Sequence, residues 1–338
     1  MLNKTIIDLN AIKDNALKIK SKLKSGVKFC AVVKADAYGH GAEMVASAIY
    51  NVVDCFAVAL VEEGVNLRRA GIDKDILVLI PPFLEDIQLA VEYNLTISID
   101  NEKMLEEVEK ECERQNAVIK AHIKFNSGMN RLGVGLNELN KICKKFKGLK
   151  RVKLEGMFSH LACPENSELT KRAVDNFLLA KSTVLCYNKN AICHLSASGG
   201  LIKGYQFGMV RIGIMLYGYK PFKCGFINLK RAMKVYAPML TNRVLTKGET
   251  FLYGDSLVGR KYKASLIRYG YADGGLRISG QGLIKNRCMD ISAIESHKNF
   301  GKLVLVMDNA EKEAKARNTI CYEVLCTASK RSERIYLN

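Results

Sequence analysis

The amino-acid sequence predicts an α/β protein: a (β/α)8 barrel of the TIM type, followed by a smaller, mostly β C-terminal domain. Over the first two thirds of the 338 residues, short apolar runs alternate with segments of helical period. Apolar strands joined by helices indicate a parallel sheet that is covered on both faces. Beyond about residue 230 the helical period fades and β-rich runs replace it.

The elements of the barrel follow one another in a regular order. Apolar residues three and four apart, from Leu9 to Leu23, mark the first helix. The eight strands that we expect are Val27–Val33, Cys55–Leu60, Ile76–Ile80, Thr96–Ile99, Val118–Phe125, Lys153–Phe158, Ile192–Leu195 and Met209–Ile214. Helical segments lie between most of them, as at 42–49, 101–115 and 168–188. Eight repeats favour a closed barrel, and an open doubly wound sheet is the alternative.

The second domain is predicted from β-rich runs. These runs are Val235–Leu240, Lys261–Ile267, Leu303–Met307 and Ile320–Cys326. We therefore place the barrel at residues 8–230 and the mostly β domain at residues 231–338. The N-terminal strand, residues 1–7, is a candidate to join the second domain.

The composition is that of an ordinary globular protein, with 48% hydrophobic and 25% charged residues, which excludes disordered and fibrous classes. Lys and Arg number 52 against 34 Asp and Glu, and the net charge of +18 would suit nucleic acid or an anionic ligand. The lysines are scattered, however, and no basic block is interleaved with aromatic residues. We therefore expect a Lys-rich surface and no nucleic-acid partner.

Targeting and redox signals are those of a cytoplasmic protein. The first ten residues lack the apolar run of a signal peptide, and the stretch Ile76–Leu84 is too short to cross a membrane. The 11 cysteines include no Cys-x-x-Cys pair. We therefore expect no disulfide framework and no metal site, but reduced thiols in the core.

The segment Ala31–Gly41 carries the clearest chemical signal. Lys34 directly follows a buried strand, and active sites of barrels form at the C-terminal ends of strands. A partly desolvated lysine has a lowered pKa and can form a Schiff base with an aldehyde cofactor. Tyr38 and two glycines follow at once, as in a tight loop that holds a phosphate. The alternative is a lysine that extends from a strand end into water.

This segment resembles the signature of the alanine racemases, which are fold-type III pyridoxal 5'-phosphate enzymes. The resemblance implies that Lys34 is the Schiff-base lysine and that Tyr38 contacts the cofactor phosphate. Further motifs in the family's order extend the resemblance over nearly the whole chain. It also implies a homodimer with shared active sites and a product, D-alanine, for peptidoglycan.

The middle of the barrel resembles the same family. Lys124–Gly133 is similar to a stretch whose lysine, here Lys124, is often carbamylated and whose arginine, here Arg131, faces the cofactor and the substrate. The resemblance places His160 beside the pyridine ring and Ser198 on the phosphate. Ala197 stands where the family often has asparagine, so one polar contact with the cofactor is expected to be missing or replaced.

The segment Val210–Gly218 resembles a second family signature. It implies that Arg211 meets the pyridine nitrogen and that the amides of Gly213 and Ile214 hold the phosphate, as the last loops of barrels commonly do. Tyr322 matches a further phosphate contact. Without the resemblance, Arg211 would be read as a buried arginine paired with an acid of the core.

The second domain contains three shorter matches, at Phe251–Gly254, Gly270–Gly274 and Cys288–Asp290. Through them the resemblance implies that Tyr253 is the second acid/base and that Tyr271 lines the entrance. The amide of Met289 would bind the substrate carboxylate, with Asp290 near the entrance. In the family, the tyrosine that matches Tyr253 comes from the partner subunit.

Racemisation requires proton removal from one face of Cα and proton delivery to the other, so Lys34 and Tyr253 are expected on opposite faces. The alternatives are a broad-specificity amino acid racemase, a basic-amino-acid decarboxylase and a non-catalytic protein of pyridoxal-phosphate homeostasis. Arg211 argues against the decarboxylase, whose pyridine nitrogen usually meets an acid. The additional domain argues against the homeostasis proteins, which are single barrels.

Overall fold

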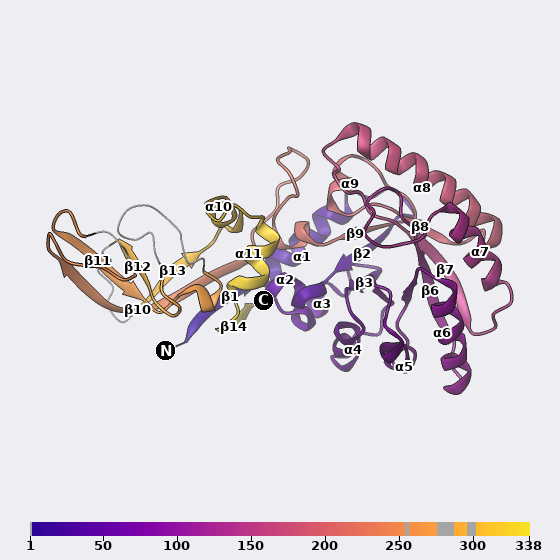
Figure 1. Ribbon diagram of the computed structural model, residues 1–338, viewed down its shortest axis with the longest axis horizontal. Coiled ribbons are helices and arrows are strands. Elements are labelled where there is room, and N and C mark those ends of the chain that lie inside the picture. Colours follow the sequence, from indigo (N-terminus) through magenta and orange to yellow (C-terminus); the bar gives the residue numbers. More distant parts are fainter. Residues whose placement is uncertain (1, 254–256, 276–286, 296–301) are drawn as a thin grey trace.

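A computed structural model describes residues 2–253, 257–275, 287–295 and 302–338. The molecule is elongated, with the barrel at one end and a β-rich sheet extending from it at the other (Figure 1). Gly254, the last residue of one predicted motif, lies outside the described residues. No helix in the described part of the chain is long and apolar enough to span a membrane.

Residues 2–253, which the structure describes without a gap, contain the eight parallel strands of the barrel. They are β2 (Lys28–Val32), β3 (Cys55–Val58), β4 (Ile76–Val78), β5 (Ile97–Ile99), β6 (Ile119–Lys124), β7 (Val152–Phe158), β8 (Ile192–His194) and β9 (Met209–Ile212). They pair as β4-β3-β2-β9 and β5-β6-β7-β8. The bridges Leu77–Thr96 and Ala197–Arg211 join the two sets, so the barrel closes. The predicted fold is confirmed, and the open sheet is wrong.

The helices pack around the strands (Figure 1). They are α1 (Leu9–Lys20), α3 (Ala42–Ile49), α4 (Val61–Arg69), α5 (Leu84–Glu92), α6 (Glu102–Arg114), α7 (Leu136–Phe146), α8 (Ser167–Tyr187) and α9 (Ser198–Ile202). Asp8, Asn101 and Asn166 begin three of them, because each side chain accepts a hydrogen bond from a backbone N–H in the first turn. The last strand ends before Ile214, which the sequence placed within it, and a 3-10 turn, η1 (Ile214–Tyr217), follows.

The described residues of the second domain form a sheet in the order β12-β11-β10-β1-β14, with β13 also paired to β10. Its strands are β1 (Asn3–Asp8), β10 (Met233–Leu245), β11 (Tyr262–Ile267), β12 (Ser292–Glu295), β13 (Leu303–Met307) and β14 (Ser332–Leu337). Strand β1 therefore lies between β10, which is antiparallel to it, and β14, which is parallel. The domain boundary at residues 230 and 231 stays a prediction.

One predicted strand is wrong. The run Ile320–Cys326 is part of a helix, α11 (Cys321–Ala328), which follows the short helix α10 (Ala310–Ala316). Its buried residues, Cys321, Val324, Leu325 and Ala328, are spaced at helical intervals and pack on the core. Only the first six residues of this eight-residue helix fall in the apolar run, so the run alone resembled a buried strand.

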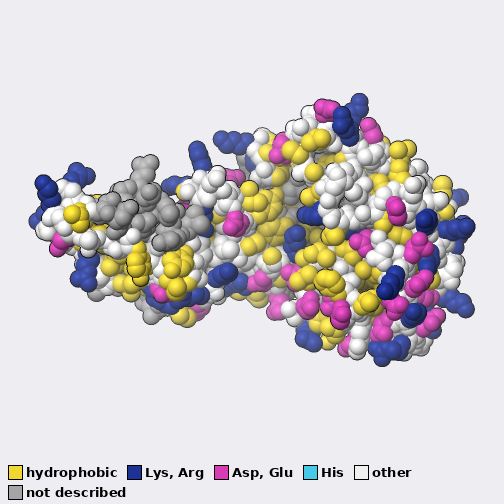
Figure 2. All heavy atoms as spheres, in the orientation of Figure 1, with side chains coloured by type: hydrophobic (Ala, Val, Ile, Leu, Met, Phe, Trp, Pro, Cys, Tyr) yellow, Lys and Arg dark blue, Asp and Glu magenta, His cyan; other side chains and the backbone are white. Residues whose placement is uncertain are grey.

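Figure 2 shows basic side chains scattered over both domains and interspersed with acidic ones on the barrel. Six of the cysteines are buried, but Cys186 and Cys326 are exposed, so the prediction of core thiols is wrong for these two.

Candidate active site

A cavity of about 840 Å³ lies at the carboxyl ends of the barrel strands. Lys34 follows β2, Lys124 ends β6 and Arg211 lies in β9, so three strands bring cationic groups to it. Of the residues singled out from the sequence, the cavity is lined by Lys34, Tyr38, Lys124, Arg131, His160, Ser198, Arg211, Gly213, Ile214 and Tyr322. Ala197 lines it as well. Tyr322 comes from α11, so both domains contribute.

The amine of Lys34 lies in this cavity and is largely removed from water. Burial lowers the pKa of Lys34, and the positive charge of Arg131 lowers it further, while Glu63 acts in the opposite direction. A larger fraction of the amine is therefore neutral near pH 7 than for a lysine in water. A neutral amine is the form that a nucleophile or a base requires.

The residues after Lys34 form a left-handed helical turn that the sequence pattern did not predict. It is labelled α2 (Lys34–Gly39), and Ala35, Asp36, Ala37 and Tyr38 have φ between 51° and 54°. Each such residue costs roughly 1–2 kcal/mol, because Cβ crowds the following carbonyl oxygen. A turn of this kind persists where its surroundings hold it in place.

The two glycines of this segment do not line the cavity, so Tyr38 is the residue of the predicted phosphate loop that faces it. Both have positive φ, and both pack against the second domain. A Cβ on Gly39 would lie 2.5 Å from the carbonyl oxygen of Leu325 in α11, and a Cβ on Gly41 would overlap the hydroxyl of Tyr336 in β14. They allow close packing between the turn and the C-terminal elements.

Tyr38, in contrast, turns into the cavity beside other phenols. Its ring centroid lies 5.0 Å from that of Tyr217 and 5.9 Å from that of Tyr322. Burial raises the pKa of both Tyr38 and Tyr322, so their hydroxyls stay protonated and can donate hydrogen bonds to an anion. A Cβ on Gly213 would overlap the Tyr38 hydroxyl, so glycine lets the backbone approach that group. Hydroxyl donors beside an accessible backbone fit a phosphate.

Arg211 is buried and fixed by acceptors of the barrel. Its Nη2 donates to the carbonyl oxygens of Ser159, at 2.6 Å, and Leu195, at 3.1 Å. Its Nη1 donates to Nδ1 of His194 at 2.6 Å. Burial lowers the pKa of Arg211 to about 10, so it stays protonated near pH 7. No carboxylate pairs with it among the described residues, so pairing with a core acid is wrong.

Two buried histidines support this arginine, and sequence reasoning assigned neither of them a role. His194 lies at the end of β8, and its Nε2 is 2.8 Å from Nδ1 of His122 in β6. Because an arginine only donates, Nδ1 of His194 accepts and Nε2 carries the proton toward His122. Burial and the charge of Arg211 hold the pKa of His122 at about 3 and that of His194 well below its usual range.

Lys124, His160 and Arg131 complete the barrel side of the cavity. The amine of Lys124 donates to the carbonyl oxygen of Leu79 at 2.5 Å, and burial lowers its pKa to about 8. Burial also lowers the pKa of His160 to about 3, so its ring is neutral. Arg131 is exposed at the cavity, where its charge lowers the pKa of all three neighbours, Lys34, Lys124 and His160.

Apart from Tyr322, the predicted site residues of the second domain lie outside this cavity. Tyr253 is 76% exposed, Met289 is 53% exposed and Tyr271 is 39% exposed. The Tyr271 turn, η2 (Tyr271–Asp273), lies beside Met289, because Ala272 N–H donates to the Met289 carbonyl at 3.0 Å. Asp290 pairs with Arg331 at 2.7 Å. In a single chain the structure therefore groups Tyr271, Met289 and Asp290 but does not bring them, or Tyr253, to Lys34.

Sequence reasoning also missed polar residues of the cavity wall. Glu165, Glu323 and Cys326 line the cavity together with the predicted residues. Glu165 follows β7 in a loop, whereas Glu323 and Cys326 share α11 with Tyr322. The helical spacing of these three residues in α11 is the signal that could have placed them on one face.

The fold and the site define a class: a two-domain barrel protein with a lysine of lowered pKa, a buried arginine and a cluster of hydroxyl donors in one cavity. Comparison with known proteins agrees with this class. The family model "Alanine racemase, N-terminal domain" matches residues 7–221, and "Alanine racemase, C-terminal domain" matches residues 232–336. An alanine racemase of Streptococcus pyogenes serotype M6 is 32% identical over 98% of this chain and 97% of its own length.

Solved structures show the same similarity. The alanine racemase of Clostridium difficile 630 is 29% identical, with a TM-score of 0.92 over 100% of this chain and 96% of its own. The alanine racemase of Bartonella henselae with covalently bound pyridoxal phosphate is 27% identical, with a TM-score of 0.87 over 100% of both chains. This chain belongs to the alanine racemase family.

Proposed function

We propose that this protein interconverts L-alanine and D-alanine with pyridoxal 5'-phosphate, as a cytoplasmic homodimer that supplies D-alanine for peptidoglycan. The observation that carries the proposal is Lys34, an amine of lowered pKa at the end of β2, in the same cavity as the buried Arg211. Membership of the family and the alanine racemases of known structure support it.

The donors of the cavity fit the proposed cofactor. Lys34 would hold its aldehyde carbon, the hydroxyls of Tyr38, Ser198 and Tyr322 its phosphate, and the backbone of Gly213 and Ile214 the same group. Arg211 would face the ring nitrogen, with His160 beside the ring. When bound, pyridoxal phosphate withdraws electrons from Cα of an amino acid, so that the Cα proton can be lost.

The protein's part in the reaction is to hold and move protons at Cα. Neutral Lys34 can accept a proton on one face, as the lowered pKa favours. Arg211 donates hydrogen bonds and accepts none, so it favours an unprotonated ring nitrogen, a weaker electron sink that promotes return of the proton to Cα. Arg131 and the Met289 amide are proposed to bind the substrate, with Tyr271 and Asp290 at the entrance.

We assign the proton transfer on the other face to Tyr253 of a second copy of this chain. Within one chain, Tyr253 is largely exposed and lies outside the cavity that Lys34 lines. The cavity of a single subunit therefore contains Lys34 but not its own Tyr253. Exposed aromatic side chains on an extended domain are typical of a surface that meets a partner. A symmetric dimer would complete both cavities in the same way.

The test is a chiral assay with the purified protein, L-alanine, D-alanine and L-serine, and a visible spectrum after addition of pyridoxal 5'-phosphate. We expect visible absorbance and conversion of either alanine enantiomer to an equal mixture. Lys34→Ala should lose both the absorbance and the conversion. A wild-type protein that stays colourless, or a Lys34→Ala variant with normal absorbance, would overturn the assignment, and equal rates with L-serine would favour a broad-specificity racemase.

A further inference from the structure

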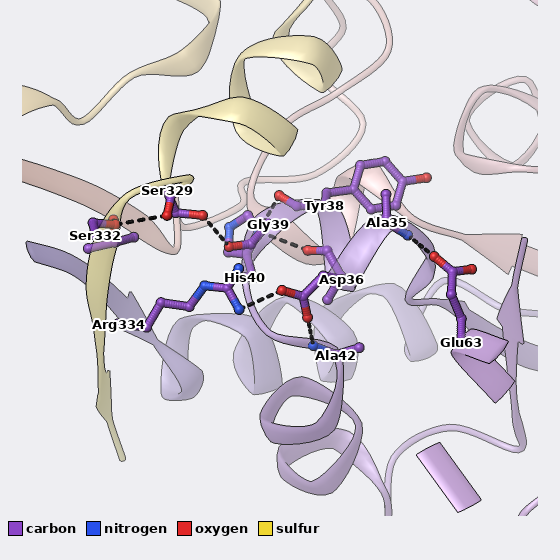
Figure 3. Close-up of polar contacts among 12 residues, drawn as sticks. Ala35, Asp36, Tyr38, Gly39, His40, Ala42, Glu63, Ser329, Ser332 and Arg334 are labelled. Carbon is purple, nitrogen blue, oxygen red and sulfur yellow. Dashed lines mark hydrogen bonds and ion pairs between the residues drawn. The ribbon is translucent and has the colours of Figure 1, made fainter. Parts of the chain in front are cut away.

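The left-handed turn that follows Lys34 is held at nearly every residue by a side chain from elsewhere in the molecule. On the barrel side, Oε1 of Glu63 accepts a hydrogen bond from Ala35 N–H at 2.6 Å. The second oxygen of Glu63 accepts from Ala59 N–H at 2.7 Å, so the glutamate is itself anchored to the end of β3. Figure 3 shows Ala35 joined to Glu63, and through this glutamate the residue next to Lys34 is tied to the neighbouring strand.

His40 holds the turn from the inside. Its Nδ1 lies 3.0 Å from the carbonyl oxygen of Ala37 and 3.1 Å from that of Tyr38. Carbonyls only accept, so Nδ1 carries the ring proton and donates to both. The ring is buried and stacks on Tyr217, whose hydroxyl donates to the carbonyl of Val32 in β2 at 3.1 Å. Burial lowers the pKa of His40 to about 4, which keeps the ring neutral.

Strand β14 holds the turn from the outside. Successive side chains of a strand alternate between its faces, so Ser332, Arg334 and Tyr336 share one face. Arg334 pairs with Oδ2 of Asp36 at 2.5 Å, and Oδ1 of Asp36 accepts from Ala42 N–H, at the start of α3, at 2.7 Å. Figure 3 shows Arg334 reaching from β14 to Asp36, while Glu63 approaches the other side of the turn.

The residue that follows α11 and the first residue of β14 also hold the end of the left-handed turn. The hydroxyl of Ser329 donates to the carbonyl oxygen of Gly39 at 3.0 Å, and the hydroxyl of Ser332 donates to the Ser329 carbonyl at 3.1 Å. Together with the packing of Tyr336 on Gly41, these contacts run along the whole segment from Asp36 to Gly41. The conformation that directs Lys34 and Tyr38 is thus set by the C-terminal strand as well as by the barrel.

We propose that His40 and Arg334 are positioning residues for Lys34: they hold the left-handed turn from its two sides and so fix where the lysine and Tyr38 enter the cavity. The inference rests on the proposed function, because it concerns the same lysine. Neither residue lines the cavity, so each acts through the turn. Loss of either contact lets the strained backbone relax and moves the amine away from its working position.

The test pairs each disruptive variant with a conservative one. His40→Leu removes the donor, whereas His40→Asn places an amide N–H where Nδ1–H stood. Arg334→Met removes the charge, whereas Arg334→Lys keeps it, and Glu333→Gln changes an exposed neighbour on the opposite face of β14. Each protein is stripped of cofactor and titrated with pyridoxal 5'-phosphate by visible absorbance. Borohydride reduction and peptide mass spectrometry then measure the fraction attached to Lys34.

We expect His40→Leu and Arg334→Met to weaken cofactor binding and to lower kcat by about tenfold, with a smaller change in KM for alanine. His40→Asn, Arg334→Lys and Glu333→Gln should stay within about threefold of wild type. If His40→Leu does not fold, the difference in cofactor attachment and kcat between Arg334→Met and Arg334→Lys decides whether the turn positions Lys34. Disruptive variants that match wild type in cofactor attachment and kcat would overturn the inference alone, whereas a wild type that never attaches the cofactor would overturn the proposed function.

Discussion

Nη1 of Arg211 donates to Nδ1 of His194 at 2.6 Å, so a buried cation is held by a neutral imidazole instead of a carboxylate. Within the part of the chain that the structure describes, the positive charge of Arg211 is therefore not compensated by a carboxylate. Burial is the main cause of the lowered pKa of His122, His160 and Lys124, and the charge of this guanidinium lowers each pKa further. An uncompensated cation on the proposed ring-nitrogen side suits an enzyme that must keep that nitrogen free of a proton.

Replacement of His194 should destabilise the protein. His194→Leu leaves one buried N–H of Arg211 without its acceptor, which should lower the free energy of unfolding by about 1–3 kcal/mol. His194→Asn offers an amide oxygen in place of Nδ1 and should recover part of the loss. Urea unfolding of the three proteins, stripped of cofactor, measures the difference. Equal stability of His194→Leu and wild type would show that the guanidinium finds another partner.

Acid should weaken the fold through the buried histidines. Their pKa is lowered in the folded protein, to about 3 for His122, so below about pH 6.5 the unfolded chain binds protons that the folded protein does not. The contribution of these neutral histidines to the free energy of unfolding is therefore fully present near pH 7 and is lost as the pH drops toward 4. His122→Asn removes one such group. Between pH 6 and 4 it should reduce the slope of the free energy of unfolding against pH by about 1.4 kcal/mol per pH unit. Urea unfolding at several pH values tests this, and an unchanged slope would contradict it.

Lys124 should bind carbon dioxide. Its pKa of about 8 gives a substantial neutral fraction near neutral pH, and the nearby charges of Arg131 and Arg211 favour an anion at this place. The neutral amine adds to the carbon of carbon dioxide and releases one proton, which leaves a carbamate. Labelling with ¹³C-bicarbonate should give a carbonyl signal in NMR that grows as the pH rises through about 8. Lys124→Arg is the control, and an identical signal in that variant would exclude Lys124.

Two different variants should restore activity when they share a dimer. Tyr253→Phe alone should slow mainly the direction that starts from the enantiomer whose proton Tyr253 removes. In a mixed dimer with Lys34→Ala, one site combines the intact Lys34 of one subunit with the intact Tyr253 of the other. Co-expression of the two with different affinity tags should therefore give mixed dimers with about half of the wild-type activity. Mixed dimers no more active than the parent variants would argue against shared sites.

The barrel could be predicted from the sequence because several of its strands are short apolar runs that alternate with helical segments. Every residue of Phe29–Val33 and Val210–Ile212 is buried. A strand that is buried on both faces can be recognised without knowing which element packs on it. The place of Lys34 followed directly, since it is the first charged residue after such a run. The resemblance to the family then indicated Tyr38 and Arg211, which the cavity brings together with Lys34.

What could not be predicted depends on contacts between distant segments. The positive φ of Ala35 and Ala37 goes against their intrinsic preference, and the groups that hold it, such as Arg334, are about 300 residues away in the chain. The pairing of His122 with His194 requires the barrel to be closed first. The predicted strand at Ile320–Cys326 failed for a related reason, because the helical spacing of α11 extends to Ala328 and becomes clear from its packing on the core.

The sheet that contains β1 has a consequence for synthesis of the protein. Strand β1 precedes every barrel strand and β14 follows all of them, yet the two lie side by side with Ile6 paired to Ile335. As the chain leaves the ribosome, the barrel can therefore assemble while β1 still lacks its neighbour. Arg334 is translated about 300 residues after Lys34, so the lysine can reach its final setting only after this distant arginine has been synthesised.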